Sequence, residues 1–199
     1  MALPVAIATP RRSAESNMFT IGRDREKEHS NRYLSNAAYR PYIHRVIDAV
    51  HDCLEGSYDP NEVRRSFTDA FNDGGSGVWE QTGSWLAKLT REFPEFADIW
   101  RDLSQNKDSK LRFRAASFLE NMPEEYFWDM LQAFSIDKSK SIRRKVAGDF
   151  GVENCVVHPR ILAFLLEWRE REKATEIIES IDFAIEHQRR AQQAASSNH

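Results

Sequence analysis

Apolar residues begin to recur at helical spacing shortly after Tyr39. They stand three or four positions apart and share one face: Ile43, Val46, Ile47, Val50 and Leu54. This spacing is typical of an amphipathic helix with one buried side. Gly56 follows, in the position just past a helix end that glycine favours. The pattern therefore predicts a helix that ends at Gly56.

Four prolines divide the rest of the chain. Each precedes an apolar pattern of helical spacing, and they stand 34, 29 and 36 residues apart: Pro60, Pro94, Pro123 and Pro159. Proline suits the first position of a helix because the N–H that it lacks would be unpaired there. Asp59, directly before the first proline, can cap the helix N-terminus. Each proline therefore predicts the start of a helix.

The first three prolines each open a pair of helical patterns separated by a polar turn, at residues 72–77, 106–109 and 137–141. The second and third pairs superpose without a gap at an offset of 31 residues. A repeated helix pair of this length is typical of an α-solenoid, whose units bury their apolar faces against their neighbours. We predict an all-α fold of stacked antiparallel helix pairs with about 8–10 helices. Whether residues 160–190 form one helix or two stays open.

The second and third pairs also share a polar motif, in which an aspartate or asparagine stands six residues before an arginine. Two sets of residues have this spacing: Asn106 with Arg112, and Asp137 with Arg143. The motif resembles that of the HEAT repeat, and the resemblance covers roughly residues 60–190. It implies a HEAT-like α-solenoid in which these side chains form a ladder between successive repeats. Trp79 stands where the first pair would carry its arginine, so the ladder is expected to break at Asp73.

The two ends of the chain lack this periodicity. Residues 1–35 are polar and mixed in charge, and residues 23–28 alternate in sign without apolar positions. We interpret residues 1–35 as a flexible or partly ordered N-terminal arm, because chain ends are loose unless they dock. Residues 36–190 then form a single HEAT-like helical domain, and residues 191–199 a disordered tail.

Positive and negative charges nearly balance over the whole chain. Its 199 residues include 28 Lys and Arg against 31 Asp and Glu, a formal net charge of −3. This balance excludes a strongly basic nucleic-acid binder and a disordered acidic chain. No apolar run approaches the roughly 20 residues of a membrane-spanning helix, and the run at residues 3–8 is too short for a signal peptide. We predict a cytoplasmic protein without membrane contact.

One predicted helix carries a stripe of potential metal ligands. His44, Asp48, His51 and Glu55 share one side of it, and imidazole and carboxylate groups suit zinc or iron. A single helix provides no second element to fix the coordination geometry, so a solvated stripe is the preferred interpretation. We predict no metal and no cofactor.

Neither cysteine belongs to a convincing catalytic arrangement. Cys53 has His51 and Asp52 as neighbours, but adjacent residues of a helix point to different faces. Cys155 has His158 three residues on, without a third group to orient the pair. Both are interpreted as packing residues in a reducing compartment. We therefore expect a protein that is not an enzyme.

Basic residues gather at the polar turns inside the second and third pairs. The two clusters are Lys107, Lys110, Arg112 and Arg114, and then Lys138, Lys140, Arg143, Arg144 and Lys145. The turns between pairs are acidic instead, with Glu92, Glu95, Glu120, Glu124, Glu125 and Asp129. Stacking would bring the basic clusters side by side. The sequence thus predicts a molecule that is basic along one edge and acidic along the other, with part of the basic charge used in the ladder.

Two of the five tryptophans are candidates for exposed binding anchors. Trp100 aligns with core positions of the neighbouring pairs, whereas Trp128 falls off the apolar stripe and Trp79 replaces the ladder arginine. Tryptophan is enriched at binding hot spots. The predicted partner-binding residues are Trp79, Arg112, Arg114, Trp128, Asp129, Lys138, Lys140, Arg143 and Arg144.

These features favour a non-catalytic module that binds a protein partner. Small helical-repeat proteins of this kind resemble inhibitors, immunity proteins and assembly adaptors. The specific hypothesis is an immunity-type protein that masks the active site of a toxin or another enzyme. The alternative is a nucleic-acid-binding protein that resembles the HEAT-like alkylpurine DNA glycosylases, which Trp128 and Asp129 superficially match. The negative net charge disfavours this alternative, because phosphate neutralisation supplies most nucleic-acid affinity. The sequence names neither the partner nor the oligomeric state.

Overall fold

The computed structural model describes residues 22–152, 155 and 157–196, and this part of the chain is helical throughout. Its ten α-helices are α1 (Arg23–Tyr33), α2 (Arg40–Glu55), α3 (Pro60–Asp73), α4 (Val78–Glu92), α5 (Asp98–Ser104), α6 (Ser109–Ala116), α7 (Glu124–Ser135), α8 (Lys140–Asp149), α9 (Pro159–Arg171) and α10 (Thr175–Ser196). Three short 3-10 helices precede α2, α5 and α7: η2 (Ala37–Tyr39), η3 (Pro94–Phe96) and η4 (Leu119–Asn121). The predicted all-α class is confirmed.

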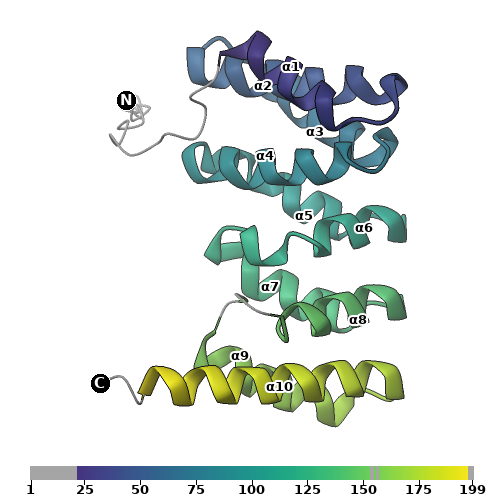
Figure 1. Cartoon of the computed structure of the whole chain (residues 1–199), viewed down its shortest axis with the longest axis vertical. Helices are drawn as coiled ribbons and strands as arrows, with labels where there is room; N and C mark the ends of the chain where they lie inside the picture. The colour runs from purple at the N-terminus through teal and green to yellow at the C-terminus, as the bar shows by residue number, and fades with distance from the viewer. Residues whose placement is uncertain (1–21, 153–154, 156, 197–199) are drawn as a thin grey trace, which may run out of the picture.

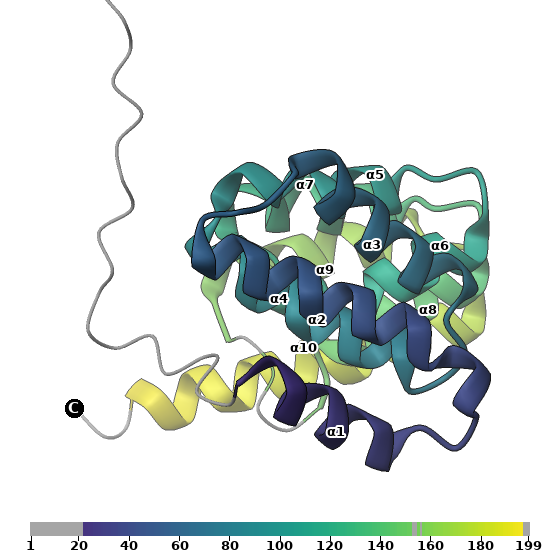
Figure 2. The ribbon, with the colours of Figure 1, turned by 90° about the horizontal axis from the view of Figure 1, so that it is seen from above.

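The helices follow one another along the long axis of the molecule, from α1 at one end to α9 and α10 at the other (Figure 1). Consecutive helices contact each other in pairs, α3 with α4, α5 with α6, α7 with α8 and α9 with α10. Alternate helices also contact each other in a row, from α2 through α4, α6 and α8 to α10. Helices α3, α5 and α7 lie together on one side of this row (Figure 2). Each inner pair therefore packs against the pair before it and the pair after it.

Proline marks helix starts in this part of the chain, as predicted. Pro60 and Pro159 are the first residues of α3 and α9, and Pro123 directly precedes α7. Pro94 opens η3 instead, and α5 follows at Asp98. The fixed φ of proline and its missing N–H explain why all four positions tolerate it.

Side-chain caps and a left-handed glycine complete these boundaries. Oδ1 of Asp59 accepts a hydrogen bond from the Asn61 amide at 2.9 Å, at the start of α3. Oδ1 of Asp108 accepts one from the Lys110 amide at 2.8 Å, at the start of α6. Gly56 ends α2 with φ of 73°, a conformation that glycine adopts without steric cost. The predicted end of this helix is confirmed.

Large aromatic side chains from successive pairs fill the core. The largest fully buried ones are Trp100, Trp168, Phe67, Phe71, Phe96, Phe134 and Phe150. Rings of neighbouring pairs meet edge to face, as between Phe71 and Trp100, whose centroids lie 6.1 Å apart. Trp100 is thus a core residue, as predicted. Burial of one such side chain contributes about 1.5–3 kcal/mol, so contacts between pairs carry much of the stability.

Part of the region predicted as a flexible or partly ordered arm, residues 1–35, is a helix. Residues 23–33 form α1, a complete helix that packs on α2. Its only buried residue is Ser30, and it has no aliphatic side chain. Apolar burial therefore does not hold α1 in place, and its polar contacts are described below. Residues 1–21 of the predicted arm lie outside the described residues.

The C-terminal region contains two helices rather than one. The carboxylate of Glu172 accepts hydrogen bonds from the amides of Lys173 and Ala174, at 3.0 and 3.1 Å, so the chain turns between α9 and α10 without glycine or proline. Helix α10 then continues to Ser196, into the segment predicted as a disordered tail from residue 191. Residues 197–199 lie outside the described residues.

Candidate functional site

Two arginines of the predicted binding set form contacts inside the molecule. Arg112 on α6 donates from Nε and Nη2 to both carboxylate oxygens of Asp137, at 2.6 and 3.0 Å, and both side chains are only 8% exposed. Arg143 on α8 makes the same bidentate contact with Glu172, at 2.9 and 3.2 Å. Arg112 also donates to the carbonyl of Asn106 at 2.8 Å, and Arg143 to the carbonyl of Asp137 at 2.6 Å. Each of these carbonyls belongs to the turn inside the arginine's own helix pair. The six-residue motif thus links the second pair to the third, and the third to the turn between α9 and α10.

These contacts stabilise the ionised form of both carboxyl groups. Burial on its own would raise the pKa of Asp137, but hydrogen bonds from the Arg112 side chain and the Ser139 amide lower it below its usual value. Burial likewise opposes ionisation of Glu172, yet hydrogen bonds from Arg143 and from two backbone amides lower its pKa to about 2. A guanidinium that donates both to a carboxylate and to a backbone carbonyl is not available to a partner. We therefore do not include Arg112 and Arg143 in the binding surface.

The first pair uses a different contact where Trp79 replaces the arginine. Arg114 on α6 donates from Nη1 to the carbonyls of Phe71 and Asn72 at the end of α3. Its guanidinium carbon also lies 5.5 Å from the centroid of the half-buried Trp79 ring. In the described part of the chain, Asp73 forms no ion pair with an arginine, as expected for a break in the ladder. Trp79 and Arg114 pack against each other and are not exposed anchors.

Trp128 is also half-buried, which contradicts the expectation of a freely exposed aromatic. The guanidinium of Arg160 lies 3.9 Å from the Trp128 ring centroid and covers one face. The His158 ring meets the indole edge to face, with centroids 6.1 Å apart. Asp129, the next residue of α7, is exposed, and so is Glu124, which lines the same pocket as Trp128. These residues form a mixed surface that is partly closed by the chain's own arginine.

Five cations of the predicted clusters remain exposed at the turns before α6 and α8: Lys107, Lys110, Lys138, Lys140 and Arg144. We call this set the basic edge. Because α6 and α8 contact each other, the two turns lie side by side. Lys140 bonds Glu176 at 3.2 Å, a pair in which both side chains are largely exposed. The other four form no ion pair with any residue in the described ranges. Lys145, by contrast, is bound to Asp149 at 2.5 Å.

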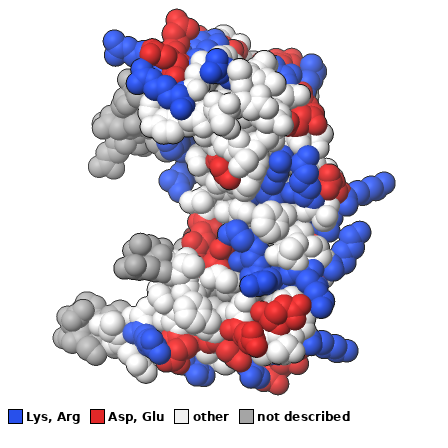
Figure 3. Space-filling model, turned by 45° about the vertical axis from the view of Figure 1, so that its right-hand side comes forward, with Lys and Arg blue, Asp and Glu red and all other residues white. Residues whose placement is uncertain are grey.

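The basic edge and the acidic turns lie at opposite ends of the same helices. Helix α7 begins at Glu124, next to the acidic turn, and ends at Ser135, next to the basic turn. Its 12 residues separate the two by roughly 18 Å at 1.5 Å per residue. Figure 3 shows the Lys and Arg side chains gathered at mid-height, on the side that faces right in Figure 1. A partner that approaches this side therefore meets mostly positive charge.

The stripe of potential metal ligands on α2 is the docking surface of α1. Arg23 bonds Asp52 at 2.8 Å, and Lys27 bonds Asp48 at 2.5 Å. Nε2 of His44 donates to Oδ1 of Asn31 at 3.0 Å. Within the described residues, no group of three or more His, Cys, Asp or Glu is arranged to hold a metal ion. The stripe thus serves a structural purpose that periodicity did not reveal.

His51, the third of these candidates, is buried between α1 and α2. Its Nε2 has no hydrogen-bond partner among the described residues. Burial, and then the nearby charge of Arg23, lower its pKa below the usual value. The imidazole is therefore neutral at pH 7.

Neither cysteine has the environment of a nucleophile. Burial raises the pKa of the Cys53 thiol to about 12. Cys155 donates from Sγ to the carbonyl of Phe150 at 3.2 Å, and burial raises the pKa of its thiol as well. His158 does not activate it, because Nδ1 of this ring accepts a hydrogen bond from the Arg160 amide at the start of α9. Both thiols are thus neutral packing groups.

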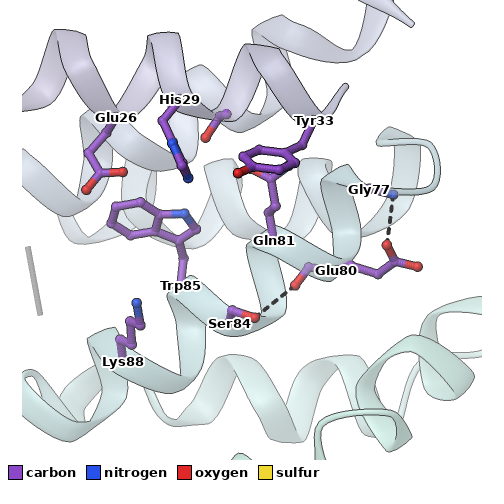
Figure 4. Close-up of a pocket in the computed structure, with 10 residues that line it drawn as sticks. Glu26, His29, Tyr33, Gly77, Glu80, Gln81, Ser84, Trp85 and Lys88 are labelled. Carbon is purple, nitrogen blue, oxygen red and sulfur yellow. Dashed lines mark hydrogen bonds between the residues drawn. The ribbon is translucent and has the colours of Figure 1, made fainter. Parts of the chain in front are cut away.

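A hollow that the sequence did not indicate lies between α1 and α4 (Figure 4). Both helices pack on α2, and the space between them is lined by side chains from each. Trp85 of α4 lies below Glu26 and His29 of α1, and Tyr33 lies above Gln81. Since α1 was not expected as a helix, this groove could not be predicted.

The comparisons with known proteins add no family. No protein-family model matches this chain, and neither the search of curated proteins nor that of solved structures finds a match. In the described ranges, no helix combines the length and the apolar character that a bilayer span requires.

Proposed function

We propose that this chain is a HEAT-like α-solenoid of stacked antiparallel helix pairs that binds an acidic protein partner through the basic edge. The observation that supports this proposal is the division of the cations between two roles. The ladder arginines are paired inside, whereas the basic edge is exposed, and four of its five members form no ion pair with a described residue. Exposed charge of one sign steers a partner of the opposite sign and raises the association rate.

A protein partner suits this surface better than duplex DNA. The feature that suggested a glycosylase, Trp128 with Asp129, lies beside Glu124 at the far end of α7 from the basic edge. One face of the indole is covered by Arg160. Duplex binding needs a row of cations along the path of the phosphates, and the cations of the basic edge lie beyond the other end of α7 from this tryptophan.

The role that this surface supports best is that of a non-catalytic inhibitor, immunity-type protein or adaptor. The specific role rests on analogy with other small helical-repeat proteins. Two buried, unpaired cysteines suit the reducing cytoplasm, where we place the protein.

Capture from the source cells, followed by measurement with the purified partner, tests the proposal. The variant Lys107→Glu/Lys138→Glu reverses two exposed charges of the basic edge that are not part of the ladder. The matched control is Arg65→Glu/Arg91→Glu, which reverses two exposed charges on α3 and α4. We expect the first variant to weaken binding by about 10- to 100-fold, mainly through slower association, and the control to change it less than about threefold.

Equal losses in both double variants, or no loss in the first, would show that the basic edge is not the binding surface. A gel-shift experiment with duplex DNA at low salt provides the complementary check. A shift at micromolar protein that Lys107→Glu/Lys138→Glu removes would favour the nucleic-acid alternative.

A further inference from the structure

A groove runs between α8 and α10 and opens at the basic edge. Its volume is about 640 Å³, and its walls are one side of α8 and the N-terminal half of α10. Gly148 lines it, and a Cβ atom there would meet nothing within 4 Å. The α8 wall therefore leaves open space at this position, which a segment of another chain could occupy.

Positive charge dominates one end of this groove. Arg144 is exposed there and forms no ion pair within the described ranges. Lys140, another member of the basic edge, lies in the same wall, and its bond to Glu176 joins two largely exposed side chains. Such a pair contributes little and can be rearranged by an incoming group. A partner carboxylate at this end would thus lie near two cations, Lys140 and Arg144, and one exposed acid, Glu176.

Apolar side chains lie at the other end. Val152 lines the groove and is 51% exposed, and Phe183 on α10 is 63% exposed. A Cβ atom at Gly151 would come within 2.5 Å of the Phe183 ring, so this ring lies against the chain directly beside Val152. Exposed apolar groups that cluster next to a groove are typical of interaction surfaces.

The distance between the charged end and the apolar side chains fits a helix. Glu176, which lines the groove, and Phe183, which lies beside Val152, are seven residues apart on α10, which corresponds to roughly 10 Å at 1.5 Å per residue. A helix that lies in the groove presents residues i and i+7 on one face, separated by the same distance. We propose that the groove between α8 and α10 binds an acidic amphipathic helix of the partner protein, with a carboxylate at Arg144 and an apolar side chain at Phe183. This inference rests on the proposed function and specifies which part of the partner is recognised.

The probe is a fluorescein-labelled helical peptide of 18 residues, with Glu and Leu seven positions apart, measured by polarisation on the full chain. Two control peptides replace the Glu by Lys or the Leu by Ser. We expect micromolar binding of the first peptide and at least about tenfold weaker binding of each control. Arg144→Glu and Phe183→Ser should each weaken binding of the first peptide by about tenfold. Lys107→Glu, on the basic edge but outside the groove, should leave this binding unchanged.

Several outcomes would overturn the proposal. These are no binding of the first peptide at about 1 mM, equal binding of all three peptides, and binding that neither Arg144→Glu nor Phe183→Ser weakens. Sedimentation of a dimer that Phe183→Ser dissociates would show instead that a second copy covers the groove. If Phe183→Ser lowers the unfolding midpoint, Val152→Ser replaces it. If binding of a captured partner requires Lys107 and Lys138 but not Arg144 or Phe183, the groove is not the recognition site, and the proposed function still holds.

Discussion

The carboxylate of Glu172 provides the sharpest test of the ladder. It accepts hydrogen bonds from Arg143 Nε at 2.9 Å and Nη2 at 3.2 Å, and from the amides of Lys173 and Ala174. Its side chain is only 6% exposed. The variant Glu172→Gln keeps the shape of the side chain but removes the charge, and it places an amide N–H where Arg143 donates. We expect this variant to lose stability at neutral pH.

The size of the loss follows from the pKa. The pKa of Glu172 falls from 4.5 to about 2 on folding, and each unit is about 1.36 kcal/mol, so ionisation stabilises the fold by about 3 kcal/mol at pH 7. Because the folded pKa is the lower one, this contribution is complete above pH 4.5 and is lost as the pH falls towards 2. At pH 3 about 1.4 kcal/mol of it remains.

Urea unfolding at pH 7 and pH 3, followed by circular dichroism, measures both values. Glu170→Gln is the matched control, because it is the same chemical change two residues earlier on the exposed side of α9. We expect Glu172→Gln to cost about 3 kcal/mol at pH 7 and about half as much at pH 3, and the control to cost nothing measurable. A cost below about 1 kcal/mol at pH 7, or an equal cost at both pH values, would refute the ladder as a source of stability.

Three further predictions concern other parts of the stack. A Cβ atom at Gly83 on α4 would overlap the ring of Phe118, which lies in the turn after α6, so Gly83→Ala should destabilise the fold by about 1–3 kcal/mol in the same urea assay. An unchanged midpoint would contradict the packing of this turn on α4. Helix α1 has no aliphatic side chain and is held by ion pairs. The variant Arg23→Ala/Lys27→Ala, or about 0.5 M salt, should therefore raise the hydrogen-exchange rate of amides in α1 and leave that of α5 unchanged. Equal protection of α1 in variant and wild type would show that other contacts hold it. With its pKa at about 12, Cys53 should resist iodoacetamide at pH 8 in the native state and react in urea, and rapid native labelling would contradict its burial.

Local chemistry made much of the helix pattern predictable. Proline at 60 and 159 and glycine at 56 act through φ and the missing N–H, which depend on the residue itself and not on distant contacts. The turn between α9 and α10 follows another rule. The Glu172 carboxylate accepts hydrogen bonds from the amides of Lys173 and Ala174, just before α10 begins, and no glycine or proline marks the place. A sequence pattern built on turn residues therefore left that boundary open.

The helix α1 shows the limit of hydrophobic periodicity. Periodicity detects helices that bury an apolar face, and α1 buries only Ser30. A different signal was present, since Arg23, Lys27 and Asn31 stand four residues apart and lie on one side of a helix. Taken alone, the matching stripe on α2 indicates a solvated surface or a set of metal ligands. Reading the two polar stripes together would have predicted the docked helix.

Trp79 and Trp128 are half-buried, and the groups that cover them come from elsewhere in the chain. Arg160 covers Trp128 from 32 residues away, and Arg114 covers Trp79 from 35 residues away. An alignment of repeats compares equivalent positions, so it identifies residues that leave the apolar stripe. It does not show which cation the stack brings over them.

The difference between arginine and lysine explains how one charged turn serves two purposes. A guanidinium can donate to a carboxylate and to a carbonyl at once in a fixed plane, so Arg112 and Arg143 satisfy groups that stacking buries. The ammonium of a lysine stays hydrated, and Lys107 and Lys138 accordingly remain exposed. Counting all basic residues at a turn thus overstates the surface offered to a partner. Within such turns, the arginine six residues after the polar turn residue is expected to hold the stack together, and the flanking lysines to determine what binds to it.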